Sequence, residues 1–177
     1  FDAPARQRAH KNFEGELESI LDAGRSAGVP VILSTVGSNL KDCAPFGSLH
    51  KTVLTTDEQS AWERDYKGGS VAQAAGDYAA ALRAFSSAAG LDSEFAELQF
   101  RRGTCELAVS NIAEAKRDFE LARDYDALGF RSDNSINGII KKAAERHREK
   151  GVSLVDAAAG LAEASPFRIR GEGLFYE

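Results

Sequence analysis

Two short polar segments after apolar runs contain the side chains of this sequence that are best placed to bind a ligand. Ser38 and Asn39 come shortly after the apolar run 31–33. Asp156 directly follows a second run, 152–155. In open α/β sheets ligands bind beyond the carboxyl ends of the strands, so these three side chains are candidates for a ligand crevice. The alternative is structural: a turn at the end of a strand for Ser38 and Asn39, and the N-terminal cap of the next helix for Asp156.

The sequence contains no recognisable set of catalytic or metal-binding residues. His10 and His50 lie in polar segments with no nucleophile or carboxylate at a spacing typical of catalysis. His147 follows the apolar positions of a helix, which predicts a surface or helix-end residue. Cys43 and Cys105 form neither a metal cluster nor a CxxC redox motif, and the sequence leaves open whether a disulfide joins them. We therefore predict no catalytic residue, no metal and no cofactor in this chain.

Composition and charge restrict the class of protein. With 177 residues, 43% hydrophobic and 28% charged, the chain has the composition of a globular protein with one core, or of one domain carrying an insertion. The net charge of −5 gives no basic surface for nucleic acid. The densest basic stretch, 141–150, is interleaved with Glu and Ala as on a solvated helix face. No apolar run approaches the ~20 residues of a membrane-spanning helix. The chain begins with Phe1 and contains no Met, which predicts a segment of a longer protein and leaves its compartment open.

The polar segments need helices and strands to position them, and the first such elements lie near the N-terminus. Gly28 stands where the C-terminal cap of a helix is expected, and the β-branched run 31–33 follows it. The order of helix, Gly and buried strand is typical of a crossover unit. Four apolar residues before the Gly have the spacing of one helix face: Phe13, Leu17, Ile20 and Leu21.

The same order of elements returns near the C-terminus. Asp133 or Asn134 is suited to cap a helix that ends near Gly151, and the strand 152–155 follows. Two buried strands, each entered from a helix, predict a parallel sheet covered by helices. The predicted fold is therefore α/β with mostly helical content, in which two strands need support from the rest of the chain. The apolar face of the second helix consists of Ile136, Ile139, Ile140, Ala143 and Ala144.

The middle of the chain contains an internal repeat of 34 residues. Small and aromatic residues recur in register, with Gly69, Ala81, Phe85 and Ala88 matched by Gly103, Ala115, Phe119 and Ala122. This order and period resemble the tetratricopeptide repeat (TPR), a pair of antiparallel helices. The match covers about two repeats, Trp62 to Ala127, whereas TPR arrays usually need at least three. Ser93 and Ala127 stand where the consensus has Pro.

The TPR resemblance implies that the first helix of each pair lines a groove for a protein or peptide partner. Chaperone-binding TPRs have Lys and Asn where this chain has Tyr66 and Ser70, so that class of partner is disfavoured. An alternative is that the helices only pack as a lid on the α/β elements. The groove candidates are Glu63, Tyr66, Lys67, Ser70 and Gln73 in one repeat, and Glu97, Phe100, Arg101 and Thr104 in the next.

The flanking segments "ELESILDAGRSAGVPVILSTVGSNL" and "DNSINGIIKKAAERHREKGVSLVD" resemble the last two helix–strand units of SGNH (GDSL-type) hydrolases. The resemblance implies a three-layer α/β sheet with a TPR insertion. The family uses a Ser in a GDS block, a GxND loop and a late DxxH motif. Here GDS and DxxH are missing, and Gly37-Ser38-Asn39 is followed by Leu40 in place of Asp.

Three functional hypotheses follow from these resemblances. The chain is a TPR-type interaction segment, or the substrate-capping part of a serine esterase or acyltransferase whose nucleophile and Asp-His pair lie outside it. The third is an α/β domain of no catalytic descent that the repeats stabilise. We expect a chain that is inactive alone, with an SGNH-like unit at 1–57, a TPR-like insertion at 58–130 and a second SGNH-like unit at 131–177.

Overall fold

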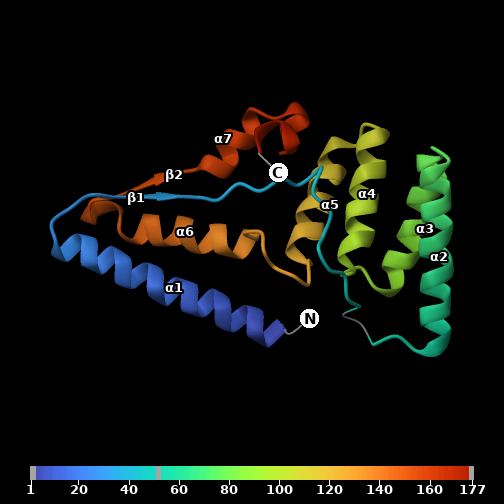
Figure 1. Cartoon of the computed structure of the whole chain (residues 1–177), viewed down its shortest axis with the longest axis horizontal. Coiled ribbons are helices and arrows are strands. Elements are labelled where there is room, and N and C mark those ends of the chain that lie inside the picture. Colours follow the sequence, from blue (N-terminus) through green and yellow to red (C-terminus); the bar gives the residue numbers. More distant parts are fainter. Residues whose placement is uncertain (1–2, 51–52, 176–177) are drawn as a thin grey trace. The chain divides into compact units, whose positions relative to one another are not determined.

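Seven α-helices and two β-strands form the regular structure of the residues that the computed structural model describes, 3–50 and 53–175 (Figure 1). These residues fall into two compact units. The α/β unit joins the chain up to Ser38 to Arg131–Arg170, and the helical unit consists of Asn39–Phe130 and the residues from Gly171 onward. The three segments expected from the sequence stay predictions, because they rest on family resemblance.

The α/β unit is built on a two-stranded parallel sheet. Strand β1 (Val31–Ser34) pairs with β2 (Val152–Val155), with Val31 opposite Val152. Both strands lie where the apolar runs predicted them, which confirms an α/β fold of mostly helical content with two parallel strands. The other elements of the unit are α1 (Ala3–Ser26), α6 (Asn134–Arg146), η1 (Arg148–Lys150), α7 (Ala157–Glu163) and η2 (Pro166–Arg168).

Helices α1 and α6 pack on one face of this sheet (Figure 1). The core that they enclose contains Leu17 and Leu21 of α1, Leu33 and Val152 of the strands, and Ile140, Ala143 and Ala144 of α6. Ile20 was expected on the buried face, and this expectation is wrong because its side chain is 60% exposed. At 3.6 residues per turn, Ile20 falls on the flank of the stripe that Leu17 and Leu21 form. Gly28, two residues after the end of α1, has a φ of +67°, as expected for a C-terminal cap.

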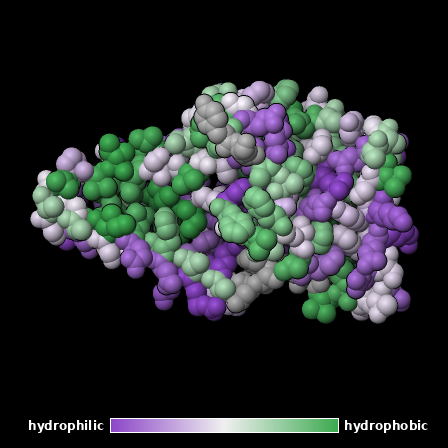
Figure 2. Space-filling view, in the orientation of Figure 1, coloured by the Kyte–Doolittle hydropathy of each residue, from purple (hydrophilic) through white to green (hydrophobic). Residues whose placement is uncertain are grey.

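The opposite face of the sheet is open within this unit. Side chains alternate along a strand, so Ile32 and Ser34 of β1 point away from the helices, together with Ser153 and Val155 of β2. Ile32 is 70% exposed. Figure 2 shows hydrophobic residues gathered over the two strands. Parallel sheets are normally covered on both faces, so a parallel sheet with one uncovered face is unusual.

The helical unit consists of two successive helical hairpins. Helix α2 (Thr56–Ala74) packs against α3 (Tyr78–Leu91), and α4 (Ala96–Ala108) packs against α5 (Ile112–Asp124). A capping box of Thr55 and Glu58 begins α2, and Asp77 caps α3 by accepting a hydrogen bond from the Ala80 N–H. A short turn, η3 (Glu172–Leu174), belongs to the same unit.

Within each hairpin, the two helices meet through a contact between a glycine and a phenylalanine, and the two contacts are 34 residues apart in the sequence. The Phe85 ring of α3 lies against Gly69 of α2, and the Phe119 ring of α5 lies against Gly103 of α4. A Cβ on Gly69 would be 2.5 Å from the Phe85 ring, and a Cβ on Gly103 would be 3.0 Å from the Phe119 ring. The glycines thus let the helices approach closely. Four alanines of the repeat are buried beside these contacts: Ala81, Ala88, Ala115 and Ala122.

Segment 46–50 makes polar contacts with residues of α4 and with residues that follow α3 and α5. The buried Asp126 carboxylate accepts hydrogen bonds from the backbone N–H groups of Phe46 and Gly47, at 2.9 and 3.0 Å. Ser48 Oγ accepts from the Glu97 N–H at 2.9 Å and so caps α4, whose own N-cap residue makes no side-chain cap. His50 Nδ1 lies 2.9 Å from Oδ2 of Asp92.

Candidate functional site

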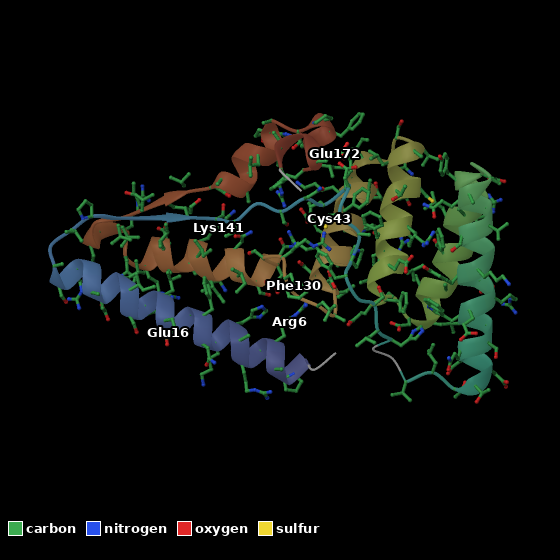
Figure 3. The ribbon with its side chains drawn as sticks, in the orientation of Figure 1. Arg6, Glu16, Cys43, Phe130, Lys141 and Glu172 are labelled. Atoms are coloured by element: carbon green, nitrogen blue, oxygen red, sulfur yellow. The ribbon has the colours of Figure 1, made fainter. Side chains whose placement is uncertain are left out.

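The carboxyl ends of β1 and β2 are joined through the carboxylate of Asp156. Thr35 Oγ1 donates to Asp156 Oδ1 at 2.8 Å, and Lys141 Nζ lies 2.6 Å from Oδ2. Figure 3 shows Lys141 on the side of α6 that faces the strands. The Thr35 oxygen also accepts the Ala158 N–H at 3.0 Å. One carboxylate thus connects β1, α6 and the start of α7.

Asp156 caps α7, which is the structural role that the sequence offered for it. Its Oδ1 accepts the Ala159 N–H at 3.2 Å. The hydrogen bond from Lys141 lowers the pKa of Asp156 most, and those from Thr35 and the Ala159 backbone lower it further, against the opposing effect of burial. Asp156 is therefore ionised at neutral pH, and both of its oxygens bind groups of the chain itself.

Asn137 of α6 binds the backbone just beyond β1. Its Oδ1 accepts the Val36 N–H at 2.8 Å, and its Nδ2 donates to the Val36 carbonyl at 2.9 Å. The side-chain amide thus pairs with Val36 as the backbone of a neighbouring strand would. This contact fixes the path of the chain where it leaves the sheet towards Ser38.

Ser38 and Asn39 lie at the end of the α/β unit and the beginning of the helical unit, respectively. The buried Ser38 hydroxyl has no hydrogen-bond partner among the described residues. The carbonyl of Ser38 accepts from Arg170 Nε at 3.2 Å, and Arg170 Nη1 donates to the Ala158 carbonyl at 3.0 Å. Asn39 Oδ1 accepts the Asp42 N–H at 3.1 Å, a local turn contact. Among the described residues, no hydrogen bond joins Ser38 to Asp156.

Each of the three histidines lies beside a carboxylate. His10 Nε2 is 2.9 Å from Oδ2 of Asp133, His50 pairs with Asp92, and His147 Nε2 is 2.7 Å from Oε2 of Glu18. His147 is the C-cap residue of α6, which confirms a helix-end position. None of the hydrogen bonds found among the described residues joins a histidine to a serine or cysteine side chain. These pairs connect helices and segments, and we assign them no chemistry.

No disulfide joins Cys43 to Cys105. Cys105 is completely buried in α4, and burial raises its pKa to about 11. Cys43 is only partly buried. Within the described residues no group of His, Cys, Asp and Glu side chains is arranged to hold a metal ion. The low thiolate content of Cys105 at neutral pH makes it a structural residue of the helical core.

Arg101 contacts three of the other groove candidates, on the face that α2 and α4 share. Its Nε donates to the Tyr66 hydroxyl at 3.0 Å, its Nη1 donates to Gln73 Oε1 at 3.2 Å, and its Nη2 lies 2.7 Å from Glu97 Oε1. Partial burial lowers the pKa of Arg101, but the contacts with Glu97 and Tyr66 outweigh it and the net shift is upward. A charged guanidinium therefore links the first helices of both hairpins.

The remaining candidates of the shared face occupy equivalent places in the two hairpins. Ser70 Oγ donates to the Tyr66 carbonyl at 2.9 Å, and Thr104 Oγ1 donates to the Phe100 carbonyl at 3.0 Å. Phe100 meets Phe119 edge to face, with ring centroids 5.4 Å apart. Glu63 and Lys67 are exposed. The face thus presents half-buried aromatic rings among polar and charged groups.

Four residues that bind Asp156, Val36 or Ser38 near the carboxyl ends of the strands were missed in the sequence: Thr35, Asn137, Lys141 and Arg170. Of these four, only Asn137 stands out in the sequence, because it is a polar residue within the apolar stripe between Ile136 and Ile140. Thr35 and Arg170 bind residues 121 and 132 positions away, and no spacing in the sequence indicates such contacts. Lys141 is one of several lysines in a basic stretch.

Comparison with protein-family models, with curated proteins and with solved structures found no match. None of the helices in the described ranges, 3–50 and 53–175, is long and apolar enough to span a membrane.

Proposed function

We propose that α2–α5 form a TPR-type interaction module that binds a protein or peptide along the face shared by α2 and α4, and that this chain is not catalytic on its own. The observation that carries the proposal is the repeated contact of a helix glycine with a phenylalanine, Gly69 with Phe85 and Gly103 with Phe119. Pairs of closely packed helices that repeat every 34 residues are typical of TPR proteins. In that architecture the first helix of each pair faces the partner.

The chemistry of the shared face supports the same proposal. Tyr66 and Phe100 offer aromatic surface, and aromatic residues are enriched at protein interfaces. Arg101 is fixed by three side chains, so little conformational entropy is lost when a partner contacts it. Glu63 and Lys67 lie exposed on the same helix and offer charges of both signs.

The test is a peptide selection on the complete chain, followed by binding measurements on variants. Peptides from a displayed library are synthesised with a fluorophore, and their affinities are measured by anisotropy. Lys67→Glu and Gln73→Arg change the shared face, and Arg83→Glu and Glu114→Gln change the charge by the same amounts on α3 and α5, the second helices of the hairpins. We expect the face variants to weaken binding by about tenfold or more and the controls by less than about twofold. Equal losses in both sets would refute the proposal.

A second candidate function rests on the α/β unit. Two helix–strand units with parallel strands, and polar side chains at their carboxyl ends, support descent from an SGNH-like hydrolase in which the helical unit caps the substrate. The test is fluorophosphonate labelling of a longer protein that contains this chain, with the label located by peptide mass. A labelled serine outside residues 1–177 supports an esterase or acyltransferase. A folded parent without label refutes it.

A further inference from the structure

Asn137 is the one asparagine of the sequence that a glycine follows. In such a pair the backbone nitrogen of the glycine can attack Cγ of the asparagine, because glycine has no side chain that shields its nitrogen. The attack closes a five-membered succinimide ring, expels the side-chain nitrogen as ammonia and releases the N–H proton to solvent. Water then opens the ring at either carbonyl and leaves aspartate or isoaspartate. Water is the only other reactant, so the reaction depends on whether the Gly138 nitrogen and the Asn137 Cγ can meet.

The helix holds the attacking nitrogen. Asn137 and Gly138 lie near the start of α6, which begins at Asn134. In an α-helix each N–H donates to the carbonyl four residues earlier, so the Gly138 N–H is directed at the Asn134 carbonyl. The Asn137 N–H donates to the Asp133 carbonyl at 3.3 Å in the same pattern. The Gly138 nitrogen therefore becomes free to attack only when this turn of α6 opens.

The end of β1 holds the group that is attacked. Asn137 is 9% exposed, and both polar atoms of its amide bind the backbone of Val36, at 2.8 and 2.9 Å. These two hydrogen bonds keep the amide in one orientation. Ile140, one turn further along α6, belongs to the core that α6 forms with the sheet. Opening of this turn therefore removes the Val36 contact and exposes part of the core.

The product of the reaction does not fit the place that Asn137 occupies. A carboxylate accepts hydrogen bonds but donates none, so an aspartate at this position would set an oxygen against the Val36 carbonyl. Isoaspartate adds a methylene group to the main chain. That insertion displaces the rest of α6, including the buried Ile140 and Ala144, relative to the strands. Both products therefore oppose the packing of α6 on the sheet.

We propose that the Asn137–Gly138 pair is a deamidation site that the folded α/β unit keeps closed, and that its reaction in an opened chain prevents the unit from folding again. A chain in which α6 stays on the sheet keeps its asparagine. A chain that stays open long enough loses the asparagine and, with it, the native contact to Val36. The inference concerns the α/β unit and does not depend on the function proposed for the helical unit.

The test compares the complete chain in native buffer at pH 8 with the same chain in urea. Trypsin cuts after Arg131 and Lys141 and releases residues 132–141 as one peptide. This peptide also contains Asn134, which is followed by serine, so fragment ions report both asparagines in one measurement. Digestion in mildly acidic buffer limits further reaction. We expect Asn137 to deamidate about a hundredfold more slowly in native buffer than in urea, because only the open fraction reacts.

Gly138→Ala is the matched control. A Cβ on Gly138 would have no atom within 4 Å, so the variant should keep both the fold and the Val36 contact. The added side chain hinders closure of the succinimide ring, and we expect Asn137 of this variant to react at least about tenfold more slowly in urea.

Both chains are then kept in urea until much of the wild-type Asn137 has reacted, and they are refolded by dilution. The folded fraction is isolated by size exclusion and its peptide 132–141 is analysed. We expect folded wild-type protein to contain unmodified Asn137, and Gly138→Ala to refold in higher yield. Asn137→Asp supplies one product directly and should refold poorly without any treatment.

Equal rates of deamidation in native buffer and in urea would overturn the proposal, and this comparison needs only the wild-type chain. Treated wild-type protein that refolds fully with Asn137 converted would also overturn it. So would a loss of refolding that follows conversion of Asn134 instead.

Discussion

Gly69 and Phe85 lie so close that the space for a Cβ on Gly69 is already filled by the Phe85 ring. The nearest ring atoms would be 2.5 and 2.6 Å from that Cβ. The adjacent Gly68 has nothing within 4 Å of its Cβ position. Of these two neighbouring glycines of α2, only Gly69 is needed for the close approach of α3, and Gly68 has room for a side chain.

We expect Gly69→Ala and Gly68→Ala to change stability in opposite directions. Alanine favours an exposed helix over glycine by up to about 1 kcal/mol, so Gly68→Ala stabilises. Gly69→Ala forces the ring and the helix apart and destabilises by about 1–3 kcal/mol. Urea unfolding followed by circular dichroism measures both. Replacing Phe85 by Leu in the Gly69→Ala background should cost less than the sum of the single changes, and simple additivity would contradict the contact.

Asp156 and Asp77 both cap helices, but only Asp156 also binds Thr35 and Lys141. We expect Asp77→Ala to lower the free energy of unfolding by about 1 kcal/mol, the usual value of a cap. Asp156→Ala should lower it by about 2–3 kcal/mol, because the buried Thr35 hydroxyl also loses its acceptor. Thermal unfolding of the two variants provides the comparison, and equal losses would show that the Thr35 contact contributes nothing.

The stabilisation from Asp156 should disappear in acid. The pKa of Asp156 is lowered in the folded chain, first by Lys141, so the ionised form is bound more favourably there than in the unfolded chain. Its contribution is complete above the unfolded carboxyl pKa, about 3.9, and is lost as the pH falls through the lower folded value. The stability difference between wild type and Asp156→Asn should therefore shrink between about pH 5 and pH 2. A constant difference across this range would exclude the charge as its source.

The two thiols should react at very different rates. The pKa of Cys105 is raised to about 11 by burial, and the side chain is inaccessible, so little thiolate is exposed to reagents at pH 8. We expect iodoacetamide to modify Cys43 first and Cys105 only when the helical unit opens. Mass spectrometry of digested samples measures the two sites separately. Rapid modification of Cys105 in the folded chain would show that α4 and α5 separate readily.

Local features of the sequence predicted the elements well. Both strands follow a helix and a glycine, and their apolar runs are too short for other structure, so periodicity and caps sufficed. Asp133 was one of two candidates for a cap, and capping was one of two roles considered for Asp156; both residues cap helices in the structure, because a helix N-terminus needs an acceptor within a few residues. The 34-residue repeat indicated that Gly69 and Gly103 occupy equivalent places, and likewise Phe85 and Phe119, but it did not predict that each glycine contacts a phenylalanine.

Contacts between distant segments could not be predicted in the same way. Asp126 binds backbone groups about eighty positions away, and any carboxylate after a helix has the same local appearance. His50 and Asp92 come from a loop and a helix end, and neither lies in a periodic pattern. Arg101 was named as a candidate, but its role in joining α2 to α4 depends on how the hairpins stack.

The separation of β1 from β2 along the chain has a consequence for the order in which the protein forms. Thr35 and Asp156, which fasten the two strands, are 121 residues apart, and the whole of α2–α5 lies between them. Helical hairpins have low contact order and fold early, whereas strand pairing across a long loop is slow. During synthesis α2–α5 therefore emerge before β2, and β1 has no partner strand until β2 follows. The pairing of β1 with β2 thus forms only after all of α2–α5 has been synthesised.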